Sequence, residues 1–114
     1  MDTTAYKILT KQQMDALEHE GVFVGAPVDL ADGYIHLSTA GQLAETLAKH
    51  FAGQDDLWLV GVDLEVLGDA VKWEESRGGA LFPHIYAPLP LSAVIAYSEM
   101  GYEPDGSLRL PVAG

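Results

Sequence analysis

The segment Tyr34–Ser38 places a histidine in an alternating pattern of polar and aliphatic residues. A strand here would turn Tyr34, His36 and Ser38 to one face of a sheet. A helix is predicted to begin at Thr39, and the free amides of a helix start favour an anion such as phosphate or carboxylate. The alternative is a core histidine bonded to a backbone carbonyl, with Ser38 or Thr39 capping the helix.

The segment Phe82–Tyr86 repeats the same pattern around a second histidine. A strand would place Phe82, His84 and Tyr86 on one face, where an imidazole and a phenol can donate, accept or stack against a flat ligand. The competing interpretation is an edge strand whose aromatic side chains only pack. Two histidines on two strands predict one shared site that joins His36 to His84.

The charged segment Trp73–Gly79 lies between these strands and contains two glycines. Its carboxylates, hydroxyl and guanidinium are suited to a loop that closes over a ligand, with Arg77 holding an anionic group. The alternative is a solvated turn in which Glu74 pairs with Arg77. Of the six basic residues, only Lys72 and Arg77 adjoin a candidate site segment.

The remaining polar residues point to no standard catalytic site. Asp29 and Asp32 are predicted to form turns by bonding their own backbone. Two histidines and a carboxylate could bind a divalent metal by residue type, but they are scattered in sequence and we predict no metal. The signatures of serine hydrolases, zincins, P-loop NTPases and Rossmann dehydrogenases are absent.

Composition indicates one globular domain over residues 1–100, followed by a loosely held tail over 101–114. Seventeen acidic against six basic residues give a formal charge of −11, which repels phosphate backbones and anionic lipid. We therefore expect a small-molecule ligand as partner, and neither nucleic acid nor a membrane. The N-terminal residues lack a secretion-signal pattern, which predicts a cytoplasmic protein. The oligomeric state is not indicated.

The hydrophobic pattern predicts an α+β domain with two main helices on a mixed, mostly antiparallel sheet. The helices should run from Thr10 to about Glu20 and from Thr39 to about Gly53. Turns are predicted over Gly25–Pro27 and Ala31–Gly33. The expected strands are Tyr6–Leu9, Val22–Val24, Tyr34–Ser38, a central Leu57–Leu64, Val71–Trp73, Phe82–Tyr86 and Leu91–Tyr97.

Several motifs in this order resemble one bacterial family, the domain of unknown function numbered 952. They are D-L-A-D-G-Y-I-H-L-S-T over 29–39, Val62-Asp63, Trp73-Glu74 and F-P-H-I-Y over 82–86. The resemblance covers about residues 6–94 and implies an ADP-ribosyltransferase-like fold, in which a split sheet holds NAD.

The resemblance also implies roles for single residues. In histidine-type members of that clan, a first-strand histidine contacts a ribose, a role that His36 fits. Tyr86 is the candidate for stacking on nicotinamide, and Glu74 for stabilising an oxocarbenium-like transition state. The clan's histidine-glycine-threonine sequence is here replaced by histidine, leucine and serine, and Glu99 lies nearer the expected position of the glutamate.

Three hypotheses follow. In the first, His36, Ser38, His84 and Glu74 are catalytic in an ADP-ribosyl transferase or glycohydrolase, while Tyr34, Thr39, Arg77 and Tyr86 bind NAD or an ADP-ribose-like nucleotide. In the second, the same pocket binds a small metabolite without turnover. In the third, the protein is an acidic interaction domain with no ligand pocket.

Overall fold

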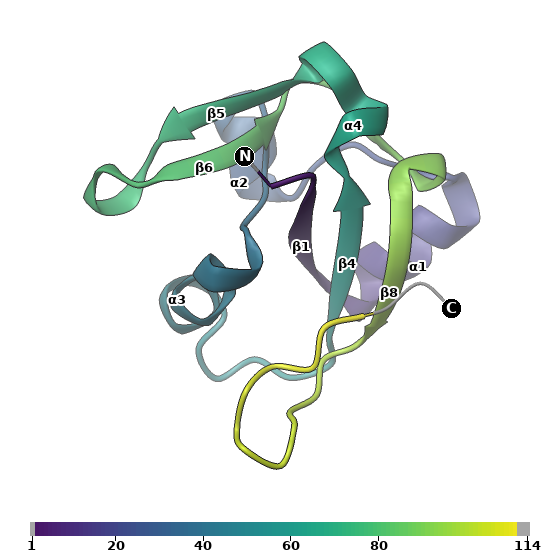
Figure 1. Ribbon diagram of the computed structural model, residues 1–114. Helices are drawn as coiled ribbons and strands as arrows, with labels where there is room; N and C mark the ends of the chain where they lie inside the picture. The colour runs from purple at the N-terminus through teal and green to yellow at the C-terminus, as the bar shows by residue number, and fades with distance from the viewer. Residues whose placement is uncertain (1, 112–114) are drawn as a thin grey trace.

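The computed structural model describes residues 2–111, except the side chain of Arg77. These residues form three antiparallel sheets and four α-helices. Figure 1 shows the β5–β6 pair crossing beside the sheet that contains β1, β4 and β8. The strands are β1 (Thr4–Thr10), β2 (Val22–Phe23), β3 (Ile35–His36), β4 (Leu57–Asp63), β5 (Val71–Glu75), β6 (Leu81–Ile85), β7 (Leu89–Pro90) and β8 (Val94–Glu99). The helices are α1 (Lys11–Glu20), α2 (Pro27–Asp32), α3 (Leu43–His50) and α4 (Leu64–Leu67).

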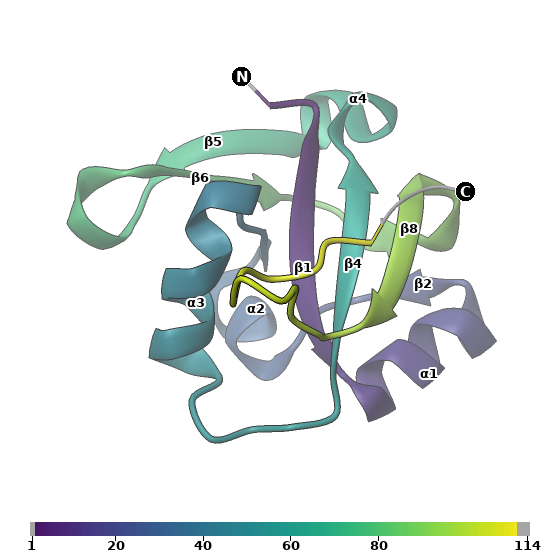
Figure 2. The same ribbon diagram turned by 60° about the horizontal axis from the view of Figure 1, so that its bottom comes forward.

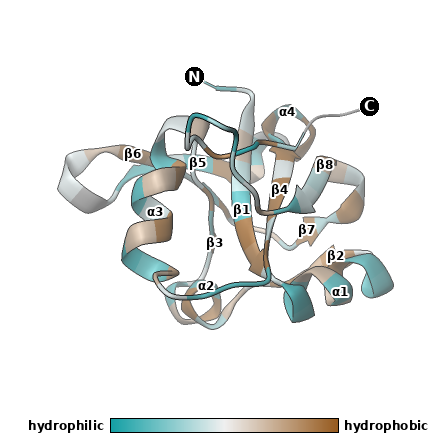
Figure 3. Ribbon diagram, turned by 90° about the horizontal axis from the view of Figure 1, so that it is seen from below, coloured by the Kyte–Doolittle hydropathy of each residue, from teal (hydrophilic) through white to brown (hydrophobic). Residues whose placement is uncertain are grey.

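The first sheet has the order β1-β4-β8, with β4 in the centre as its continuous apolar sequence predicted. Both neighbours run antiparallel to β4. Most of β4 is buried because the sheet is covered on both faces, and Figure 3 shows hydrophobic stretches along β1 and β4.

The third sheet has the order β3-β6-β5 and carries the candidate site residues. It meets the first sheet at one point, where the backbones of Tyr6 and Ser38 exchange two hydrogen bonds of 2.8 and 2.9 Å. The two sheets diverge on either side of this contact, as Figures 1 and 2 show for β1 and the β5–β6 pair. The first and third sheets are therefore splayed and, within residues 2–111, joined by a single bridge.

Two helices line the open side of this junction. Figure 2 shows α2 and α3 beside β1, while α1 lies against the other end of the first sheet. Helix α1 begins with the predicted capping box, in which Thr10 and Gln13 bond each other's backbone amides. Leu43 is buried in a small apolar cluster beneath α3, with Ile8, Leu57 and Leu59. Within residues 2–111, no helix is long and apolar enough to cross a membrane.

The structure differs from the sequence predictions in specific ways. Every strand pair is antiparallel, and the strands form three sheets, so the expected single mixed sheet is wrong. Two of the four helices were not predicted, α4 and α2. Helix α2 replaces the two turns, because Pro27 suits the first helical position and Asp29 accepts a hydrogen bond from the preceding amide of Ala26.

Some element ends also shift. The segment before β8 forms a 3-10 turn over Leu91–Ala93, so this strand starts later than predicted. The second main helix begins with a 3-10 turn over Ala40–Gln42. In the tail, residues 101–111 fold back on themselves, and Leu108 and Leu110 pack against the α3 cluster. The last three residues of the predicted tail, 112–114, lie outside the described residues.

Candidate functional site

A pocket of about 540 Å³ opens at the junction of the two sheets. Its walls come from β1, α2, β3, α3 and β6, so segments far apart in the sequence meet there. The polar side chains that line it are Tyr6, Lys7, Thr10, Gln13, Asp32, His36, Ser38, Thr46, His50, Ser76 and His84. Pockets of this size and mixed polarity commonly hold small-molecule ligands.

The structure brings His36 and His84 together in this pocket. They are directly opposed in the β3–β6 pairing, and their ring centroids lie 5.3 Å apart. The alternating patterns of both segments therefore place the two imidazoles on the same face of the sheet, as the sequence predicted. Tyr34 lies on this face too, stacked on His84 with ring centroids 4.2 Å apart.

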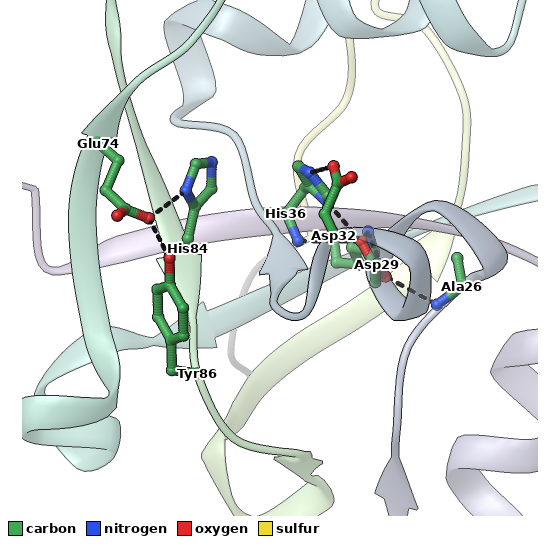
Figure 4. A network of polar contacts seen from close by, with 8 residues as sticks. Ala26, Asp29, Asp32, His36, Glu74, His84 and Tyr86 are labelled. Atoms are coloured by element: carbon green, nitrogen blue, oxygen red, sulfur yellow. Dashed lines mark hydrogen bonds and ion pairs between the residues drawn. The ribbon is translucent and has the colours of Figure 1, made fainter.

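His84 is held by a carboxylate on the neighbouring strand. Figure 4 shows Glu74 of β5 between His84 and Tyr86, with Glu74 Oε1 2.7 Å from His84 Nδ1 and 2.8 Å from the Tyr86 hydroxyl that donates to it. Hydrogen bonds from His84 and Tyr86 lower the pKa of Glu74, so this carboxylate is ionised at neutral pH. Because the carboxylate can only accept, Nδ1 of His84 is the nitrogen that carries a proton and donates it to Glu74.

The other ring nitrogen of His84 has a different setting. Only 3% of His84 is exposed, yet its side chain lines the pocket. Among the described residues, none forms a hydrogen bond with Nε2 of His84. Because Nδ1 carries the proton, Nε2 is the basic nitrogen, and it can accept a proton from a bound group.

His36 is held in the same way, but from helix α2. Its Nδ1 lies 2.7 Å from Asp29 Oδ1, and its backbone amide donates to the same oxygen at 3.1 Å. Asp29 is 2% exposed and also accepts from the Ala26 amide at 2.7 Å. Its remaining partner is the buried ammonium of Lys7, with Nζ 3.0 Å from Oδ2. One buried carboxylate thus ties β1, α2 and β3 together.

The electrostatics of this cluster decide its charge state. Burial alone would raise the pKa of Asp29, but the His36 hydrogen bond, the Lys7 charge and two backbone amides hold it at about 2. Burial also lowers the pKa of Lys7, while Asp29 opposes that effect. Asp29 is therefore a carboxylate at neutral pH, with its buried charge balanced by Lys7 and hydrogen-bonded by His36.

Unlike that of His84, the second ring nitrogen of His36 is occupied. Asp32, the last residue of α2, places Oδ2 2.9 Å from His36 Nε2. Figure 4 shows His36 between the two aspartates, both of which come from the same short helix. Asp32 is the one carboxylate among the described side chains that line the pocket, and 45% of its side chain is exposed.

Ser38 and Thr39 lie close in sequence but have different surroundings. Ser38 is buried and lines the pocket, where its Oγ is 2.8 Å from Oγ1 of Thr46 on α3. Since the Thr46 hydroxyl donates to the Gln42 carbonyl, the Ser38 hydroxyl is the donor of this pair. Thr39 caps the following 3-10 turn and is not among the pocket residues.

Other predicted site residues lie at the margin or elsewhere. Tyr86 is half-exposed and lines, with Tyr34, a separate hollow of about 260 Å³. Glu99 is exposed on β8 in the first sheet, outside the pocket. The Arg77 side chain lies outside what the structure describes, so its predicted role as an anion holder stays a prediction. Glu74 lies in β5 and not in a turn, and it bonds His84 and Tyr86. Its alternative pairing with Arg77 involves a side chain outside the described residues.

Sequence reasoning missed the residues that hold His36. Asp29 and Asp32 were expected to be turn residues, but Asp29 is the buried centre of the cluster and Asp32 its exposed end. Proline followed by aspartate two residues later, at the first and third positions of a helix, could have indicated α2. Lys7 gave no comparable signal, because its burial depends on how β1 lies against α2. Within residues 2–111, no group of three or more His, Asp and Glu side chains is arranged to hold a metal ion.

Comparison with known proteins identifies the family. The chain belongs to the family described as protein of unknown function (DUF952), which matches residues 8–97. The crystal structure of protein CC0527 from Caulobacter crescentus is 48% identical, with 94% of each chain covered and a TM-score of 0.84. The solution NMR structure of the same protein is 50% identical over 92% of this chain and 90% of that one, with a TM-score of 0.78. No curated protein matches the chain.

Proposed function

We propose that the pocket binds NAD or an ADP-ribose-like nucleotide and that His84 acts as the general base in cleaving or transferring its ribosyl group. The observation that carries this proposal is the state of His84. Its Nδ1 is fixed by ionised Glu74, while Nε2 lies in the pocket region without a partner among the described residues. A histidine oriented by a carboxylate in this way is a recurring arrangement for proton transfer in enzymes.

In the hydrolytic version of the reaction, His84 Nε2 removes a proton from water while the water oxygen bonds to the anomeric carbon of the ribose. The bond from that carbon to the nicotinamide nitrogen breaks, and its electron pair stays on the leaving ring, which becomes neutral. In the transfer version, an acceptor hydroxyl replaces water. Glu74 then stabilises the imidazolium that His84 becomes.

This proposal assigns Glu74 a role as a positioning residue. Glu74 does not line the pocket, and its Oε1 already accepts from His84 and Tyr86. It therefore acts on the ligand through His84, by fixing the tautomer and the ring orientation. Tyr86 in turn donates a hydrogen bond to Glu74. We therefore assign Tyr86 to orienting Glu74 and not to stacking on nicotinamide.

The rest of the pocket suits a ribosyl ligand. Hydroxyl and amide side chains of Ser38, Thr10 and Gln13 line it and can bond sugar hydroxyls. Tyr6 and Phe82 supply aromatic surface within the same pocket. A volume of about 540 Å³ is large enough for the nicotinamide riboside end of NAD, with the remainder extending along the open side.

Binding without turnover is the second candidate, and the contacts of His36 favour it. Both of its ring nitrogens already bond aspartates, so the first-strand histidine is not free to contact a ribose until Asp32 moves. A protein that only senses its ligand needs affinity and no proton transfer. Turnover measurements distinguish this candidate from the first.

The test compares wild type with His84→Gln, which keeps a polar side chain but lacks a basic nitrogen. We expect nicotinamide release from NAD by wild type and a loss of about 10²–10⁴-fold in the variant, the usual contribution of a general base. His19→Gln is the matched control, because His19 is an exposed residue on α1. Binding of NAD by calorimetry with no release would favour the sensing function. If wild type neither binds NAD nor releases nicotinamide, the nucleotide proposal is rejected.

A further inference from the structure

The two imidazoles of the pocket have different numbers of carboxylate partners. His36 faces a carboxylate at each ring nitrogen, Asp29 at 2.7 Å and Asp32 at 2.9 Å. Because a carboxylate oxygen can only accept, each of these two contacts is a hydrogen bond that a ring N–H of His36 donates. His84 has one such partner, Glu74 at Nδ1.

The titratable groups around His36 come from three elements. Asp29 and Asp32 belong to α2, Lys7 to β1, and His84 lies opposite on β6. With Asp32 in place, Lys7 and a His36 ring that donates at both nitrogens balance the two aspartates. If Asp32 turned away, the cluster would carry one net positive charge beside the pocket.

Asp32 differs from Asp29 in its attachment. Asp29 is buried and accepts from three neighbouring residues, whereas the Asp32 side chain is 45% exposed and, among the described side chains, hydrogen-bonds only to His36. Returning Asp32 to water therefore breaks one contact and leaves the buried cluster intact. The carboxylate occupies a position where Nε2–H of His36 would meet a ligand oxygen.

We propose that Asp32 is a displaceable occupant of an anion position, and that an anionic oxygen of the ligand, such as a phosphate or pyrophosphate oxygen, replaces it on His36 Nε2. This inference deepens the proposed function and rests on the same pocket. It assigns His36 and Lys7 to the acidic portion of the ligand, and His84 to the group that loses a proton. Asp32 thereby lowers the affinity for ligands whose charge is too weak to displace its carboxylate.

The test measures affinity for ADP-ribose and for inorganic pyrophosphate by calorimetry in wild type and Asp32→Ala. Removal of the internal competitor should tighten binding of both probes by about tenfold, the scale of one hydrogen bond to a charged group. Asp69→Ala is the matched control. Asp69 is exposed, and its side chain forms no hydrogen bond or ion pair with the other described residues. It removes the same charge and should leave both affinities unchanged. Asp32→Asn, which can still accept from Nε2, should give an intermediate gain.

The outcomes separate this inference from the proposed function. Tighter binding of pyrophosphate alone would support the anion position and reject the nucleotide as ligand. Binding of ADP-ribose that Asp32→Ala weakens or leaves unchanged would overturn the displacement, while the nucleotide proposal would stand. An equal gain in affinity in Asp69→Ala would show that the effect comes from the overall charge of the protein, and it would also overturn the displacement. No binding of either probe by any folded variant would overturn both.

Discussion

The His36 cluster, with Asp29, and the His84 cluster, with Glu74, share one type of hydrogen bond but differ in their surroundings. In each, a carboxylate lies 2.7 Å from Nδ1 of a histidine on the β3–β6 pair. Around His36 the carboxylate is fully buried, and Lys7 and backbone amides surround it. Around His84 the carboxylate is partly exposed, and the far ring nitrogen has no partner among the described residues. The first arrangement links β1, α2 and β3 through one buried carboxylate, and the second leaves one ring nitrogen facing the pocket.

From this comparison we predict that a substitution affects stability more when the carboxylate is buried than when it is exposed. A buried charge must keep its partners, because losing one leaves the others uncompensated. An exposed one can change its partners with little effect on the fold. Substitutions at corresponding positions in the two clusters should therefore differ in what they affect.

The largest expected effect on stability is that of Asp29→Asn. This substitution leaves the Lys7 ammonium buried without its counter-charge, so the free energy of unfolding should fall by about 3–5 kcal/mol. Urea denaturation followed by circular dichroism measures it. Asp15→Asn is the control, since Asp15 pairs with Lys11 on the exposed face of α1. Adding Lys7→Met to Asp29→Asn should recover part of the loss, and no recovery would contradict the pairing.

The next effect is a loss of stability in acid that depends on Asp29. Its pKa lies at about 2 in the folded protein against an ordinary 3.8, so its contribution is complete above pH 4 and disappears as the pH falls through 2. This carboxyl alone should account for about 2 kcal/mol between these limits. The measurement is the difference between wild type and Asp29→Asn in urea midpoints from pH 5 to pH 2. Parallel curves would show that the low pKa is absent.

A smaller effect on stability is expected from Glu74→Gln. The amide still accepts from Tyr86, and the site is partly exposed, so the unfolding midpoint should shift far less than in Asp29→Asn. The rate of any His84-dependent reaction should fall, because an amide no longer stabilises the His84 imidazolium. Restoration of the carboxylate on a shorter stem in Glu74→Asp should recover part of the rate. A stability loss as large as that of Asp29→Asn would remove the distinction between the clusters.

The sequence predicted the His84 side of the site better than the His36 side. Local alternation was enough to place His36, His84 and Tyr34 on one face, because side-chain direction in a strand follows from position alone. The nearly continuous apolar sequence of β4 was enough to identify this strand as the centre of a sheet. The nearness of Glu74 to His84 followed from their strands being neighbours, although the bond itself was not predicted.

The parts that could not be predicted depend on contacts between distant segments. Helix α2 has six residues, too few for a clear periodic pattern. The pairing of Lys7 with Asp29 joins residues 22 positions apart and requires the sheet junction to form first. A lysine in an alternating strand is normally expected on the solvent side, and here its burial follows from the carboxylate that it meets.

The contrast between the two histidines is tested by long-range ¹⁵N–¹H NMR of protein labelled at its four histidines. We expect the Nδ1 of each imidazole to be hydrogen-bonded to a carboxylate, and Nε2 to be hydrogen-bonded in His36 but not in His84. His36→Gln and His84→Gln variants assign the signals. A hydrogen bond at Nε2 of His84 in the free protein, or none at Nε2 of His36, would contradict the claim that the carboxylates hold the two imidazoles differently.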